Sequence, residues 1–118
     1  DSITVSTFNE TSGGSGIFES SSIRVHEVAD KHGLITFVAY LNAYFGKLYA
    51  YGTLDDTVSG SSAWFAIPLG SINDYADYTS ATTKLDPFNL TIATKYIKFQ
   101  HVPDASNAGT LTKILVRA

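Results

Sequence analysis

The chain of 118 residues contains no cysteine and no methionine. Without cysteine it can form no disulfide, thiolate nucleophile or thiolate metal site, so its stability must come from the core or from neighbouring subunits. Charged residues are scarce, at 16%, against roughly 25% in an average soluble protein. The formal net charge of −3 offers no basic field for a phosphate backbone. We therefore expect no nucleic-acid partner.

Long apolar runs are also missing. None approaches the ~18 residues that cross a bilayer, and residues 1–16 are too polar for the apolar segment of a signal peptide. We therefore expect no membrane partner. The Asp at position 1 and the absence of methionine favour a processed piece of a longer protein.

Short segments of period-two alternation fill the chain, and no stretch of twelve residues shows a helical stripe. This pattern predicts an all-β fold, either an antiparallel β-sandwich or a Greek-key, jelly-roll-like barrel of about seven or eight strands. The glycine-rich "NETSGGSG" divides an N-terminal strand and flexible Gly/Ser loop (1–16) from a single β-sandwich head domain (17–118). We expect strands at 2–8, 22–30, 34–41, 47–54, 63–70, 87–94, 95–102 and 111–118.

Three of these segments carry further expectations. Residues 87–94 and 95–102 alternate around a short connection, which predicts a hairpin. The segment 34–41 is nearly all apolar, so it is buried on both faces or lies at a subunit contact. The expected core comprises Ile23, Val25, Ile35, Phe37, Leu48, Phe65, Ile67, Leu90, Ile92, Ile97, Phe99, Ile114 and Val116.

The order "SIRVHEVAD..GLITFVAYLNAY", "WFAIPLG" and "LDPFNLTIATKYIKFQHVPDASNAGTLTKILVRA" resembles the C-terminal receptor-binding head module of baseplate and tail-fibre proteins from phages of Gram-positive bacteria. The similarity covers roughly residues 20–118, and "ATKY" stands where that pattern usually has a hairpin glycine. The resemblance implies a homotrimeric host-adhesion head that recognises cell-wall polysaccharide. It also implies a location on the virion, at the tail tip or baseplate, outside the host cell.

Sequence signals for catalysis are absent. There is no nucleophile elbow, phosphate-binding loop or dinucleotide fingerprint, and the three histidines lack zinc-site spacing. The aspartates lie in turns and loops, where Asp is favoured for its local hydrogen bonds. Loop oxygens from "NDYAD" with Asp55 or Asp56 could hold calcium, but nothing resembles an EF-hand loop. We expect no enzyme activity, no cofactor and no metal.

Saccharide binding needs aromatic rings beside polar groups on a rigid surface. In 47–54, Leu48 and Ala50 fall on one face of a strand and Tyr49 and Tyr51 on the other. Trp64 beside Phe65 is more often half-buried core, whereas the tyrosines of "NDYADY" lie in a turn-rich segment. The predicted site comprises Tyr49, Tyr51, Trp64, Asp74, Tyr75, Asp77 and Tyr78.

Two other functions remain open. One is a structural baseplate or capsid assembly module without a ligand, whose exposed aromatics and apolar strand pack against neighbouring subunits. The other is a carbohydrate-binding module of a secreted protein. Assembly alone requires an oligomer without a ligand, whereas both binding functions require a surface that retains saccharide.

Overall fold

The computed structural model describes residues 2–25, 34–70, 73–91 and 94–117, which contain nine strands and no helix. All paired strands are antiparallel, so the expected all-β antiparallel class is confirmed. The strands are β1 (Ser2–Val5), β2 (Asn9–Glu10), β3 (Phe18–Glu19), β4 (Ile23–Arg24), β5 (Leu34–Thr53), β6 (Phe65–Ile67), β7 (Ala76–Thr91), β8 (Tyr96–Pro103) and β9 (Thr110–Arg117).

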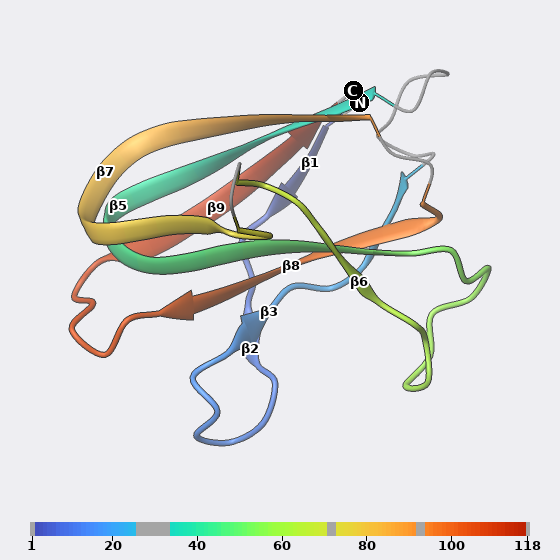
Figure 1. Cartoon of the computed structure of the whole chain (residues 1–118), viewed down its shortest axis with the longest axis horizontal. Coiled ribbons are helices and arrows are strands. Elements are labelled where there is room, and N and C mark those ends of the chain that lie inside the picture. Colours follow the sequence, from blue (N-terminus) through green and yellow to red (C-terminus); the bar gives the residue numbers. More distant parts are fainter. Residues whose placement is uncertain (1, 26–33, 71–72, 92–93, 118) are drawn as a thin grey trace.

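One long strand, β5, organises the sheet. Its first half pairs with β9 on one edge and β7 on the other, and its second half pairs with β8 on one edge and with β6 and β7 on the other. Figure 1 shows β5 and β7 turning together at one end of the molecule. The single sheet therefore curls into a half-barrel with two layers. We call the layer with β9 and β1 the upper layer and the layer with β8 and β3 the lower layer.

The bend in β5 depends on an irregular stretch at its middle. Register shifts fall between Leu41 and Tyr44 and between Tyr44 and Gly46, and Ala43 and Gly46 have φ angles of 53° and 157°. A β-bulge inserts a residue and bends its strand. It also exchanges the two faces, so that odd-numbered residues such as Phe37 are buried before it and even-numbered residues such as Leu48 after it.

The hydrophobic core lies between the two layers. Phe37 of the upper layer contacts Phe99 of the lower layer, with ring centroids 4.9 Å apart. Leu90 is only partly buried against the core, and Ile92 lies outside the described residues. The expectation for Phe65 is wrong, because it lies on the short edge strand β6 and is 45% exposed. The other expected core residues are all buried.

The predicted hairpin of 87–94 and 95–102 is also wrong. The strands there, β7 and β8, pair with opposite edges of β5 and not with each other. Strand β7 also begins at Ala76, inside the segment expected to be a turn-rich connection. Alternation identified the strand at 87–94 but carried no information about its partner, because pairing is decided by tertiary packing.

The N-terminal residues belong to the same sheet. Strand β1 pairs with β9, and β2 pairs with β3. The Gly/Ser loop between β2 and β3 is closed by a hydrogen bond from the Thr11 amide to the Ile17 carbonyl, 2.8 Å long. The Glu10 carboxylate accepts hydrogen bonds from the Gly14 and Gly16 amides, at 3.2 and 2.9 Å.

Candidate functional site

The second half of β5 carries two tyrosines on the outer face of the lower layer. Leu48 and Ala50 are buried beneath, and Tyr49 and Tyr51 are half-buried on the opposite side, as strand parity predicts. The two tyrosine rings lie nearly parallel, with centroids 5.9 Å apart and an interplanar angle of 12°. The core beneath is therefore complete without these rings.

Two further rings extend this surface. Tyr75, just before β7, lies with its centroid 5.1 Å from that of Tyr49. Trp64, just before β6, reaches over β5 to Lys98 on β8, whose ammonium nitrogen is 4.3 Å from the indole centroid. Thr53 of β5 is fully buried. We call Tyr75, Tyr49, Tyr51 and Trp64 the aromatic strip.

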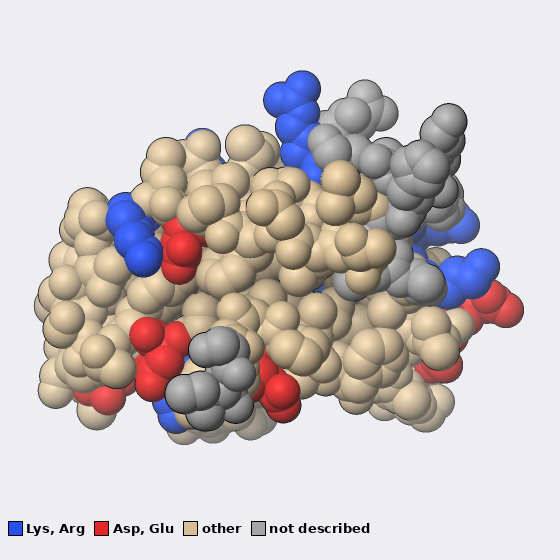
Figure 2. Space-filling model, turned by 45° about the horizontal axis from the view of Figure 1, so that its top comes forward, with Lys and Arg blue, Asp and Glu red and all other residues tan. Residues whose placement is uncertain are grey.

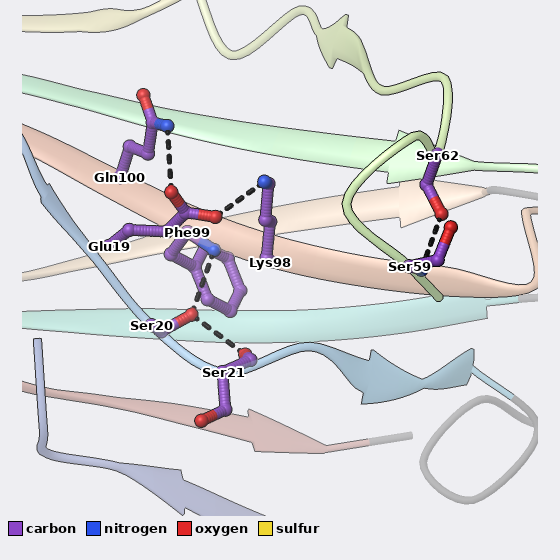
Figure 3. Close-up of polar contacts among 8 residues, drawn as sticks. All are labelled: Glu19, Ser20, Ser21, Ser59, Ser62, Lys98, Phe99 and Gln100. Carbon is purple, nitrogen blue, oxygen red and sulfur yellow. Dashed lines mark hydrogen bonds and ion pairs between the residues drawn. The ribbon is translucent and has the colours of Figure 1, made fainter. Parts of the chain in front are cut away.

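Charged and polar groups border the strip. The Lys47 ammonium lies 4.8 Å from the centre of the Tyr75 ring, and Asp77 is the cross-strand neighbour of Lys47. At the other end, Glu19 of β3 forms an ion pair with Lys98 and accepts a hydrogen bond from the Gln100 amide at 3.3 Å. Figure 3 shows Lys98 and Gln100, both from β8, pointing toward this carboxylate.

The surface is hollowed at both ends of the strip. A hollow of about 320 Å³ is lined by Trp64, Lys98, Glu19 and the loop that holds Ser59 and Gly60. A second, of about 250 Å³, is lined by Lys47 and Asp77 together with Phe45 and residues 102–105. Ser20, Ser22 and Ser59 supply hydroxyl groups to the lining of the first hollow. The Ser59 amide donates a hydrogen bond to the Ser62 hydroxyl oxygen within the loop, at 2.8 Å (Figure 3). The strip thus lies between two concave regions.

The surroundings of Tyr51 at the centre of the strip disfavour ionisation of its phenol. Burial raises the pKa of Tyr51 above its ordinary value, and the nearby Tyr49, Glu19 and Asp74 raise it further. A neutral phenol can both donate and accept a hydrogen bond. Both functions suit a partner that presents hydroxyl groups.

Tyr78 is separated from the other predicted site residues. It is buried on the inner side of β7, edge-on to Tyr44, and its hydroxyl donates to Asp86 at 2.5 Å. We expected it to lie in a loop, but it lies within a strand, where parity directs it inward. The remaining predicted residues, Asp74 and Asp77, are exposed beside the strip.

The sequence analysis missed four polar neighbours of the strip: Lys47, Lys98, Glu19 and Gln100. Alternation along β8 does place Lys98 and Gln100 opposite the buried Ile97 and Phe99. Their position beside the tyrosines follows only from the pairing of Tyr49 with Gln100 and of Tyr51 with Lys98. That pairing could not be inferred once β8 was assigned to a hairpin with β7.

The outer face of the upper layer is largely apolar. Val38 is aligned with Pro87 and Leu115, and Tyr40 with Leu85 and Lys113. Leu85 is 60% exposed, and the Lys113 ammonium lies 4.7 Å from the Tyr40 ring centre. In Figure 2, uncharged residues make up most of the visible surface. Strand 34–41 is therefore buried on one face and half-exposed on the other, not buried on both.

Comparison with protein-family models, with curated proteins and with solved structures finds no match. Within the described ranges, no three His, Asp or Glu side chains gather as potential metal ligands. The same ranges contain no helix that is long and apolar enough to cross a membrane.

Proposed function

We propose that this chain binds saccharide through the aromatic strip. The observation that carries the proposal is the row of tyrosine rings on the solvent side of the lower layer, in which Tyr49 lies 5.9 Å from Tyr51 and 5.1 Å from Tyr75 between ring centroids, bordered by carboxylates. A pyranose ring can stack its apolar face on such a ring, while carboxylate oxygens accept hydrogen bonds from its hydroxyls.

The strip also meets the requirement for rigidity. Tyr49 and Tyr51 belong to a central strand paired on both edges, and each ring is supported by its neighbour. A preformed surface loses little conformational entropy when a ligand binds. The row of rings between two hollows suits an extended oligosaccharide more than a single sugar.

The biological setting follows from the resemblance noted in the sequence. We propose that the chain is a receptor-binding head of a phage tail or baseplate and that its ligand is a cell-wall polysaccharide of a Gram-positive host. In this setting the protein is a homotrimer on the virion, acts outside the cell and catalyses no reaction. A carbohydrate-binding module of a secreted protein would use the same site, and adsorption to host cells separates the two.

The upper layer supports a second candidate function. Its outer face exposes Leu85 and Pro87 beside Val38, Tyr40 and Leu115. Apolar surfaces of this kind often mark contacts between proteins. This face favours an assembly role, which can coexist with saccharide binding because the aromatic strip lies on the other layer.

The direct test is a glycan array that carries neutral and acidic bacterial polysaccharides, followed by calorimetric titration of the retained glycan. We expect Tyr49→Ala or Tyr75→Ala to lower affinity about ten- to a hundredfold, equivalent to about 1 to 3 kcal/mol. Tyr40→Ala, on the outer face of the upper layer, is the matched control and should leave affinity unchanged.

Two results would overturn the proposal. One is the absence of any retained glycan on an array that includes host cell-wall polysaccharide. The other is intact binding and host-cell adsorption by folded Tyr49→Ala, Tyr51→Ala and Tyr75→Ala variants. The aromatic strip would then belong to packing or to subunit assembly.

A further inference from the structure

We infer that the aromatic strip selects uncharged saccharides and rejects polyanionic ones. The inference rests on the proposed saccharide-binding function and adds the charge class of the ligand. It follows from the charged groups that border the strip and from the partners that each already has.

Two carboxylates beside the strip are available to a ligand. Asp74 and Asp77 are exposed, and neither forms an ion pair with a described residue. Each can accept hydrogen bonds from sugar hydroxyls, which are donors. An anionic substituent placed at the same positions would instead meet a like charge.

The two cations at the strip are already engaged. Lys98 is held between the Glu19 carboxylate and the Trp64 ring, and its side chain is only 15% exposed. Lys47 lies over the Tyr75 ring, with Asp77 beside it on the neighbouring strand. An anionic group could recruit either lysine only by competing with these contacts. The cations therefore serve to hold the rings and are poorly placed to bind anions.

The charges do not cancel. Glu19, Asp74 and Asp77 contribute three negative charges, and Lys47 and Lys98 contribute two positive charges, which leaves one net negative charge at the strip. The whole chain carries a formal charge of −3. The raised pKa of Tyr51, caused in part by Glu19 and Asp74, reflects the same negative field. A polymer with a carboxylate or phosphate in every repeat meets this field along its whole length.

The ligand class is therefore a neutral polysaccharide, built from hexoses, deoxyhexoses or N-acetylhexosamines. Such sugars supply apolar ring faces for the tyrosines and hydroxyl donors for the carboxylates. Uronic acid polymers and polyol-phosphate polymers carry a negative charge in each repeat. Selection against them is a repulsive form of specificity, which adds to the attractive contacts with the rings.

The experiment compares matched pairs of oligosaccharides by calorimetric titration of the intact chain. Hexamers of glucose, galactose and mannose are each paired with the corresponding uronic acid hexamer, so that the two members differ only at C6, where a carboxylate replaces the hydroxymethyl group. We expect at least one neutral hexamer to bind, and its acidic partner to bind about tenfold more weakly at low salt. That difference should shrink at high salt, while neutral binding stays constant.

Substitution isolates the carboxylates. Asp74→Asn with Asp77→Asn keeps an acceptor oxygen at each position and removes two charges. We expect the affinity for the uronic acid hexamer, relative to that for its neutral partner, to rise roughly threefold to tenfold in this double variant, because two like charges are removed. Asp56→Asn removes an exposed carboxylate that pairs with Lys95, 3.6 Å away, and serves as the control.

The outcomes separate the inference from the proposed function. Tighter binding of an acidic hexamer than of its neutral partner would overturn the charge selection and leave saccharide binding in place. An unchanged ratio in the double variant would show that Asp74 and Asp77 do not produce the selection. If no member of any pair binds and the glycan array retains nothing, both the proposed function and this inference are wrong.

Discussion

Phe99 and Phe65 are the same side chain in two different environments. Phe99 is fully buried against Phe37, and its amide donates a hydrogen bond to the Ser20 hydroxyl oxygen at 3.0 Å, whereas Phe65 is 45% exposed on the edge strand β6. We expect Phe99→Ala to lower the free energy of unfolding by about 3 to 5 kcal/mol, because it leaves a cavity between the layers. Phe65→Ala should cost less than about 1 kcal/mol. Urea denaturation of both variants measures the difference, and equal losses would contradict the assigned burial.

His101 makes stability depend on pH. It lies among the rings of Phe8, Phe18 and Tyr44, and its Nδ1 is 3.2 Å from the Tyr44 hydroxyl. Burial lowers the pKa of His101 from 6.5 to about 4. The unfolded chain therefore takes up a proton before the folded one does. The contribution of neutral His101 to the free energy of unfolding is fully present above pH 6.5. It is lost as the pH drops toward 4, and the loss is roughly 1 to 2 kcal/mol after allowance for partial exposure to solvent.

The comparison that isolates this effect is His101→Phe. Acidic residues also titrate toward pH 4 in both proteins. The relevant quantity is therefore the loss of unfolding free energy between pH 7 and pH 4, compared between the parent chain and the variant. We expect the parent chain to lose more stability than the variant over this interval. Identical pH profiles would show that His101 is not held neutral by burial.

Residue-level prediction succeeded where side-chain parity within one segment was sufficient. The outward direction of Tyr49 and Tyr51 follows once Leu48 and Ala50 are known to face the core. The inward direction of Tyr78 can be predicted only if its segment is known to be a strand, and the polar sequence "SINDYADY" suggests turns instead. Alternation along β8 places His101 on the inner face with Ile97 and Phe99.

At the level of elements, the bend in β5 depends on a close approach by the loop before β9. A methyl group on Gly109 would lie 2.0 Å from the Ala43 carbonyl oxygen, in the bulged stretch. The side-chain oxygen of Asn107 in the same loop accepts hydrogen bonds from the backbone amides of Phe45 and Gly109, at 2.9 and 3.1 Å. The bulged stretch of β5 and the loop before β9 cannot move apart without breaking these hydrogen bonds.

Gly109→Ala should therefore destabilise the chain by about 2 to 4 kcal/mol, because the clash is with backbone atoms. Gly13→Ala is the matched control, since a methyl group there meets nothing within 4 Å. Thermal unfolding followed by circular dichroism measures both. A Gly109→Ala variant as stable as Gly13→Ala would contradict the packing of this loop on the bend.

Strand positions could be predicted from alternation, but strand partners could not. The segments 34–41 and 47–54 were correctly assigned to strands, yet they form one bent strand with a bulge between them. Because the bulge exchanges the faces, parity carried from Ile35 through to Tyr49 would have placed Tyr49 inward. The position of the bulge depends on Ala43, Gly46 and the contact with Gly109, which involve residues far apart in the sequence.

At the level of the whole molecule, the two layers present different outer faces. The lower layer carries the aromatic strip, and the upper layer exposes Leu85 and Pro87 beside Tyr40. The proposed receptor-binding head is a trimer, and the exposed apolar face favours assembly through the upper layer. Closed cyclic symmetry would hide that face from water.

Sedimentation equilibrium tests this arrangement. We expect the chain to sediment at three times its mass of 12.7 kDa and Leu85→Glu to shift it toward the monomer. Since Leu85 is 60% exposed, the substitution should change the unfolding free energy of the monomer by less than about 0.5 kcal/mol. A parent chain that is monomeric at micromolar concentration, or a Leu85→Glu variant that remains trimeric, would contradict assembly through this face.

The most direct test of the saccharide-binding account is an NMR titration with the glycan that the array retains. We expect the amide and side-chain resonances of Tyr49, Tyr51, Tyr75 and Lys98 to shift with ligand concentration. Those of Val38, Tyr40 and Leu85 on the upper layer should stay in place. Shifts confined to the upper layer, or no shifts with any glycan of the array, would contradict the assignment of the aromatic strip as the binding site.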